Sequence, residues 1–223
     1  MFTKIATRLF TLAVCTLVLG IFSTAAQAAL IANLNNTGTS GGVALVGAGV
    51  ADPNYSLIVQ PGSATAVTVD HTIWPIFGGP WVPNNAASRW IGPDASSQGP
   101  PGNYTYRTTF TVPNNAILST VNVSGLWGTD DPSIDILING NSTGNVSAGF
   151  TSLVPFNVTS GFVFGTNTLD FALNNAGGPT GLRVDHIVGT YQIPEPGTVC
   201  LAVAAFVATV SVPRRRRSEV QMT

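Results

Sequence analysis

Three carboxylates lie within six residues, in the segment DDPSID that begins at Asp130. Calcium takes six to eight oxygen ligands, so Asp130, Asp131 and Asp135 are candidate Ca²⁺ ligands on a loop that enters a strand. The alternative is that the first two bond their own turn and that Asp135 is solvated. The segment lacks the D-x-[DN]-x-[DN]-G spacing of common calcium loops. We therefore predict no obligatory cofactor and keep calcium as a hypothesis.

Tryptophans are the second set of candidate contacts, because amphipathic aromatic rings can stack on sugar rings. Trp74 and Trp81 lie in the loop HTIWPIFGGPWVPNN, whose Pro and Gly content would present them to solvent. Trp127 follows an apolar alternation and is expected in the core. Packing is the alternative for every tryptophan. The candidate glycan-binding residues are Trp81, Trp90, Asp130, Asp131 and Arg183.

Arginines could bind a carboxylate or a uronic acid through two parallel hydrogen bonds. Arg89, Arg107 and Arg183 are the only lysines or arginines between residues 29 and 193. The alternative is an Arg–Asp pair across neighbouring strands, with Asp135 or Asp185 as the partner.

Patterns of catalytic residues are missing from the sequence. It contains no G-x-S-x-G, no H-E-x-x-H and no glutamate between residues 29 and 193. Of the two histidines, His186 shares the strand parity of its apolar neighbours, which predicts a core histidine. We predict that the protein is not an enzyme. A glycan-active enzyme would need a solvent-facing cluster of Asp185, His186 and a serine.

The elements that position these residues are strands. Period-two alternation places Tyr104, Tyr106, Phe110 and Val112 on one face of YTYRTTFTV. SIDILING, TLDFALNN and GLRVDHIVGTY alternate in the same way, and turn residues separate the segments. Less patterned strands around 43–45, 57–59 and 66–69 would complete the sheets. The sequence therefore predicts an all-β, antiparallel β-sandwich over residues 29–193.

Charge and cysteine content exclude several classes of function. Only 9% of the residues are charged, and residues 29–193 carry three arginines against eight aspartates, a formal charge of −5. Because residues 29–193 contain no lysine and only three arginines, they offer few cations to the phosphates of a nucleic acid. We therefore predict no nucleic-acid binding. Cys15 and Cys200 lie in the apolar terminal segments, which leaves residues 29–193 without a disulfide or a thiolate metal site.

Both termini read as targeting segments. Residues 1–28 combine Lys4 and Arg8 with an apolar run and the small residues Ala26 and Ala28, which predicts a signal helix cleaved by signal peptidase after Ala28. Residues 194–223 contain a short hydrophobic helix, expected over about 197–213, followed by four arginines. Those arginines would stay on the cytoplasmic side of the membrane. They are Arg214, Arg215, Arg216 and Arg217.

The C-terminal segment resembles the PEP-CTERM sorting signal. Pro194, Glu195 and Pro196 precede the hydrophobic helix and the arginine cluster, in the order typical of that signal. The resemblance covers about 30 residues. It implies processing by an exosortase, a membrane protease, and association with extracellular polysaccharide and the biofilm matrix. The implied route is export across the inner membrane, anchoring by the C-terminal helix, and then the cell surface or extracellular matrix.

The central segment resembles galactose-binding-domain-like jelly rolls from Trp90 to Tyr191. The similarity lies in a strand that ends in FTVP, followed by GLWGTDDPSIDILING. It implies a jelly-roll sandwich, a fold that serves sugar-binding, adhesive and structural modules. We therefore expect a secreted, surface-sorted, non-enzymatic matrix protein that binds carbohydrate. The alternatives are a purely structural or adhesive surface protein without a small-molecule site and, third, a glycan-active enzyme.

Overall fold

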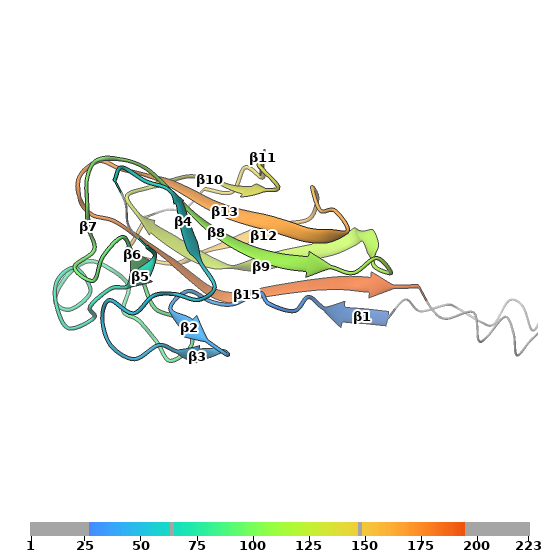
Figure 1. Cartoon of the computed structure of the whole chain (residues 1–223), viewed down its shortest axis with the longest axis horizontal. Helices are drawn as coiled ribbons and strands as arrows, with labels where there is room; N and C mark the ends of the chain where they lie inside the picture. The colour runs from blue at the N-terminus through green and yellow to red at the C-terminus, as the bar shows by residue number, and fades with distance from the viewer. Residues whose placement is uncertain (1–26, 63–64, 147–148, 195–223) are drawn as a thin grey trace, which may run out of the picture. The chain divides into compact units, whose positions relative to one another are not determined.

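The computed structural model describes residues 27–62, 65–146 and 149–194. A compact unit spans Ala28–Ile193 and consists of two β-sheets whose apolar faces share one core (Figure 1). Every strand pair with a defined register is antiparallel, and the described ranges contain no helix. The predicted all-β antiparallel sandwich is therefore confirmed.

Strand order defines the two sheets. One contains β12 (Val154–Val158), β9 (Ile117–Asp130), β15 (Gly181–Ile193), β6 (Ile91–Gly92) and β5 (Val67–Thr68), with β1 (Gln27–Leu30) also on β15. The other contains β11 (Asn141–Ser142), β10 (Ser133–Ile138), β13 (Gly165–Asn175), β8 (Gly102–Val112) and β4 (Ser56–Val59). Two ribbons pair β2 (Thr39–Ser40) with β3 (Val43–Ala44), and β7 (Gln98–Gly99) with β14 (Gly178–Pro179).

The ribbon of β2 and β3 corrects one sequence prediction. Residues 43–45 were expected to complete a sheet, but β3 pairs with β2 across the turn of Gly41 and Gly42. Both glycines have positive φ, the conformation that a two-residue hairpin turn requires. The other two predicted segments hold, since β4 joins β8 and β5 joins β6.

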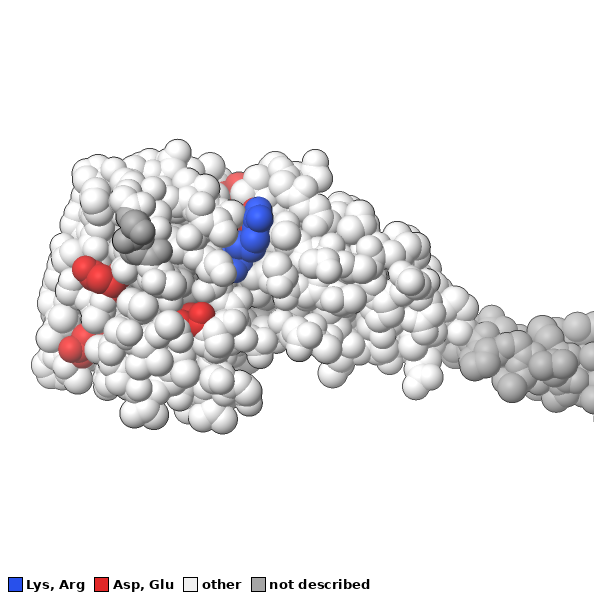
Figure 2. All heavy atoms as spheres, viewed as in Figure 1, with Lys and Arg blue, Asp and Glu red and all other residues white. Residues whose placement is uncertain are grey.

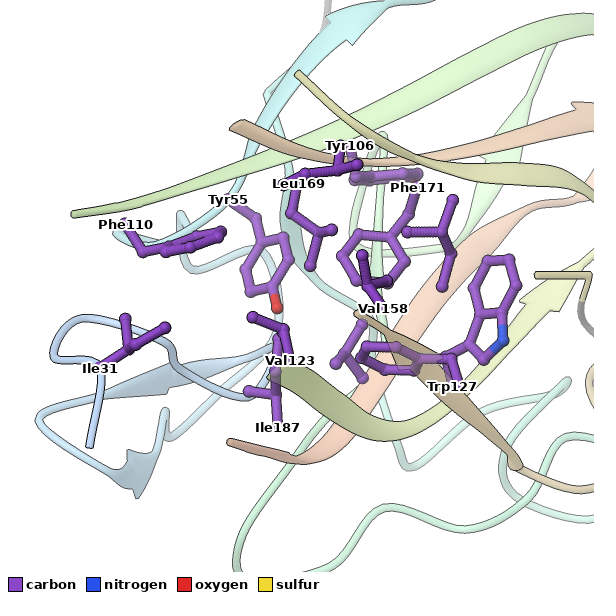
Figure 3. Packing of buried hydrophobic residues seen from close by; sticks show 14 of the residues in the cluster. Ile31, Tyr55, Tyr106, Phe110, Val123, Trp127, Val158, Leu169, Phe171 and Ile187 are labelled. Atoms are coloured by element: carbon purple, nitrogen blue, oxygen red, sulfur yellow. The ribbon is translucent and has the colours of Figure 1, made fainter. Parts of the chain in front are cut away.

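The core forms where the alternating faces of the two sheets meet. Tyr106, Phe110 and Phe171 point inward from β8 and β13, and Val123 and Trp127 meet them from β9 (Figure 3). The Trp127 and Phe171 rings lie 5.6 Å apart between centroids. The predicted core position of Trp127 is confirmed, and aromatic burial of this size supplies much of the stabilisation.

Two bulges shift the side chains relative to the sequence prediction. The register slips between Asp185 and Val188, where His186 has a φ of 51°. Beyond this bulge the inward parity changes, so that Ile187 is buried and His186 is exposed. A similar slip between Ser133 and Asp135 leaves Ile134 exposed. The prediction of a core histidine at position 186 is therefore wrong.

Most of the targeting residues lie outside the described part of the chain. These are Ala26, Glu195, Pro196 and the four arginines 214–217, whereas Ala28 and Pro194 are described. The described residues form no helix that is long and apolar enough to cross a membrane.

Candidate functional site

Two of the candidate tryptophans lie inside the protein. Trp81 and Trp90 form a second apolar cluster with Val69 and Ile76, and their rings lie 4.3 Å apart between centroids. The Trp90 indole N–H donates to the carbonyl of Val82 at 2.8 Å. Because both rings are buried, neither face is open to a sugar, and the expectation that Trp81 and Trp90 contact glycan is wrong.

The loop that follows β5 exposes a different set of apolar side chains. Trp74 is 54% exposed and Phe77 is 72% exposed, and Ile73 beside them is also exposed. Between them Ile76 turns inward and joins the second cluster. This loop, Asp70–Trp81, therefore presents Trp74 to solvent, as the sequence predicted. Trp81, for which the same exposure was predicted, is buried instead.

The same loop is held in one conformation by its own backbone. The Phe77 amide donates to the Ile73 carbonyl at 2.9 Å, and the Trp81 amide donates to the Pro75 carbonyl at 3.1 Å. A Cβ on Gly79 would lie 2.2 Å from the Pro75 oxygen, so the close approach requires glycine. The exposed aromatic rings thus sit on a preorganised support.

Asp130 is a buried carboxylate at the end of β9. Its Oδ2 accepts a hydrogen bond from the Trp81 indole N–H at 2.6 Å. Burial raises the pKa of Asp130 to about 7, against the opposing effect of the Trp81 hydrogen bond and with a further contribution from Asp131. Asp130 therefore holds Trp81 in the second cluster. Its carboxylate is buried and offers no surface contact to a glycan.

The three aspartates of DDPSID do not converge. Asp131 Oδ2 accepts from the Ala176 amide at 2.7 Å, while Asp130 faces Trp81. Asp135 lies on β10 and accepts from the Ser142 hydroxyl. The described residues contain no group of three or more His, Cys, Asp or Glu side chains arranged to hold a metal ion. The geometry expected for calcium at Asp130, Asp131 and Asp135 is thus not formed.

Arg183 lies in a buried polar network. Its Nε donates to the Ser88 hydroxyl at 2.9 Å, and its guanidinium also bonds the Pro83 carbonyl. Its Nη2 lies 3.5 Å from Asp185 Oδ2, and Asn85 donates to the same oxygen at 2.8 Å. Burial lowers the pKa of Arg183, and Asp185 acts in the opposite direction. Arg183 therefore joins the loop 82–90 to β15 through hydrogen bonds. Because its side chain is buried, it is not accessible to a ligand.

Arg107 forms the cross-strand ion pair that the sequence favoured, with a different partner. Its Nε and Nη2 bond the two oxygens of Asp170 at 2.6 and 2.7 Å. Asp170 lies opposite Arg107 in the register of β8 and β13. The hydrogen bonds raise the pKa of Arg107. Two of the three central arginines are thus engaged by aspartates, which leaves them unavailable for a uronic acid.

His186 projects from the bulge of β15 and lies beside a buried carboxylate. Its side chain is 71% exposed, and its Nδ1 lies 3.1 Å from Asp185 Oδ1. The described hydrogen bonds join His186 to Asp185 and not to a serine. Of the solvent-facing cluster of Asp185, His186 and a serine that an enzyme would need, His186 alone faces solvent, because Asp185 is buried.

Only some of these features could be predicted from the sequence. Phe77 and Ile73 were missed as exposed residues, and the available signal was the IWPIF run in a Pro- and Gly-rich loop. The burial of Trp81 and Trp90 had no such signal, because it arises from contacts between residues of one long connection and the ends of β9 and β15.

Comparisons with known proteins do not assign this chain to a family. No protein-family model matches the chain, and no significant match is found among functionally characterised proteins. Similar solved structures include a cyclase from Fischerella sp. TAU, at 10% identity and a TM-score of 0.46, covering 76% of this chain and 100% of that one. Another is a family 35 carbohydrate binding module from Clostridium thermocellum, at 15% identity and a TM-score of 0.30, covering 61% and 87%. With both scores below 0.5, neither informs the function of this chain.

Proposed function

We propose that this chain is an exported, non-enzymatic β-sandwich that binds extracellular polysaccharide through the Asp70–Trp81 loop. The observation that carries the proposal is the exposure of Trp74 and Phe77 on a loop anchored by buried Ile76. Contiguous exposed apolar patches mark interaction sites on proteins. A sugar ring can cover such aromatic faces while its hydroxyls remain hydrated.

Preorganisation and charge both favour this ligand. The internal hydrogen bonds of the loop mean that little conformational entropy is lost when a ligand binds. Charged side chains are sparse on the face shown in Figure 2. An acidic body with few cations is poorly suited to anionic lipids or nucleic acids, whereas an uncharged sugar pays no electrostatic cost.

The place of action is proposed from the terminal segments. The signal-like N-terminus and the PEP-CTERM-like tail support export across the inner membrane, handling by signal peptidase and an exosortase-type protease, and membrane anchoring before processing. The cell surface or the polysaccharide matrix would then be the destination. We also propose that the body is a galactose-binding-like jelly roll. The two facing antiparallel sheets support this proposal.

The test is binding of the purified protein to a panel of polysaccharides, measured by affinity electrophoresis and calorimetry. We expect Trp74→Ala to weaken binding at least tenfold, about 1.4 kcal/mol, because a stacking face is lost. The matched control is Phe164→Ala, which removes a 48% exposed aromatic ring from a different loop and should leave binding unchanged. Failure of the unaltered protein to bind any polysaccharide would contradict the proposal and favour a purely structural role.

A further inference from the structure

A polar groove lies beside β8, on different elements from the Asp70–Trp81 loop. It has a volume of about 330 Å³, within the range of small-molecule sites. β4 pairs with β8 only at residues 105–107, and no described strand continues that pairing along Thr108–Val112. The groove occupies this part of the β8 edge, where the segments around Asn33 and Asn54 form its other wall.

The side chains that line the groove are mostly hydroxyls and amides. Thr109 and Thr111 point outward from alternate positions of β8, and Thr166 lies opposite Thr111 on β13. Across from them are the amides Asn33, Asn35 and Asn54. A threonine hydroxyl both donates and accepts, and an amide offers two donors and a carbonyl oxygen, which is what a sugar hydroxyl needs.

The amide wall is held in place by hydrogen bonds to the body. The Tyr55 hydroxyl donates to the Asn35 carbonyl at 2.8 Å, and Asn54 Nδ2 donates to the Thr39 carbonyl at 2.6 Å. The Asn54 side-chain oxygen has no bond among the described contacts, so it remains available to a ligand. The groove is therefore built before a ligand arrives, which lowers the entropy lost on binding.

No charged side chain lines the groove. The adjacent carboxylate, Asp52, is buried and turned away. Its Oδ2 accepts from the Gly38 amide at 2.6 Å, and its Oδ1 accepts from the amides of Asn54 and Tyr55 at 2.7 and 3.2 Å. An anionic ligand would meet no cation here to compensate the loss of its hydration.

We infer that this groove is a second saccharide site that takes uncharged sugar units and rejects uronic acids. The inference rests on the proposed function, because it assigns a ligand class and a second contact surface to the same polysaccharide. Thr109, Thr111 and Asn54 supply the hydrogen bonds, while Trp74 supplies the stacking face at the other site.

A peptide strand is the competing occupant of an open sheet edge, since it would add to the backbone of β8. Such pairing forms hydrogen bonds with the main-chain groups of β8 and leaves the outward side chains of β8 in water. Replacing threonine by the similarly shaped valine would hardly affect it. A saccharide depends on the hydroxyls themselves, so the same replacement separates the two occupants.

The test uses calorimetry with the full-length protein carrying Trp74→Ala, so that the groove is the site that is measured. The ligands are uncharged hexasaccharides of glucan, mannan and galactan type, and an oligogalacturonate. We expect the double change Thr109→Val with Thr111→Val to weaken binding of the uncharged hexasaccharide at least tenfold, because two hydrogen bonds are lost. The matched control Thr105→Val lies on the same face of β8, outside the groove, and should bind as Trp74→Ala alone does. The oligogalacturonate should bind at least tenfold more weakly.

The possible results distinguish the two proposals. Hexasaccharide binding by the unaltered protein but not by Trp74→Ala, or binding by Trp74→Ala that the two valines leave undiminished, would overturn the groove inference and leave the proposed function standing. Equal affinity for the oligogalacturonate would overturn the selectivity. If the unaltered protein binds no saccharide at all, both proposals fail.

Discussion

Asp130 shows how one buried side chain can make the stability of this protein depend on pH. The carboxyl has a pKa of about 7 in the folded protein against an ordinary 3.8, chiefly because of burial. A raised pKa means that the folded state binds the proton more tightly than the unfolded state. This contribution to stability therefore falls as pH rises from about 4 to about 7 and stays low above that.

The change Asp130→Asn removes this dependence and keeps an oxygen that can accept from Trp81. We expect the variant to be more stable than the unaltered protein at pH 8 and to lose that advantage near pH 5. Thermal melts between pH 5 and pH 8, followed by tryptophan fluorescence, measure the difference. Asp94→Asn, at an exposed turn, is the control and should keep the original slope. A slope unchanged by Asp130→Asn would show that this carboxyl is not the source.

At the level of elements, two arginine–aspartate pairs differ in how deeply they are buried. Arg183 and Asp185 are both buried and join β15 to the loop 82–90. Arg107 is 36% exposed on the outer face of β8, whereas its partner Asp170 is only 7% exposed, so this pair is buried on one side only. A buried charge left without its partner costs much more than an exposed one.

We expect Arg183→Met to lower the free energy of unfolding by about 3 kcal/mol, because Asp185 loses its cation in the interior. The matched change Arg107→Met should cost less than Arg183→Met, because Arg107 is partly exposed and its removal opens the buried carboxylate of Asp170 to water. Urea denaturation at pH 7 measures both. Equal losses would mean that the amides of Asn36 and Asn85, which also contact Asp185, are sufficient to stabilise its charge.

The elements also show how far the sequence could predict the structure. Strict alternation of apolar and polar residues was enough to predict β8 and β13. Their inward-facing residues, such as Tyr106 and Phe171, are buried as predicted. The bulge at His186 could not be read, because an extra residue in a strand leaves no mark in the polarity pattern. The candidate site was harder still. Trp81 and Trp74 have similar local sequence, and only tertiary contacts decide that one is buried and the other exposed.

For the whole molecule, the arrangement of the chain ends is informative. β1 pairs with β15, so the described chain enters and leaves the sandwich at the same end (Figure 1). The connection between β5 and β6, which contains the Asp70–Trp81 loop, lies at the opposite end in the same view. A tether at the chain ends would therefore leave the Asp70–Trp81 loop at the far end of the sandwich from the point of attachment.

The expected signal cleavage after Ala28 would remove half of β1, since that strand begins at Gln27. Gln27 and Ala28 are exposed, whereas Ile31 is buried and its amide donates to the Gly189 carbonyl at 2.8 Å. We expect chains starting at Gln27 and at Ala29, both ending at Ile193, to melt within about 2 °C of each other. A chain starting at Ala32 should melt at least about 4 °C lower, because a core side chain is lost. Calorimetric melts compare the three, and an equal drop for the Ala29 chain would contradict the cleavage position.

The long pairing of β15 with β9 has a mechanical consequence. The register runs from Gly181 opposite Asp130 to Gln192 opposite Ile117, and the described chain continues from the end of β15. If the tail tethers the protein while a polymer pulls on the far end, the load runs along β15. The hydrogen bonds to β9 then share that load in shear and must give way together, whereas a strand peeled from its end loses them one at a time. A sandwich tethered in this way could hold a polysaccharide layer under flow.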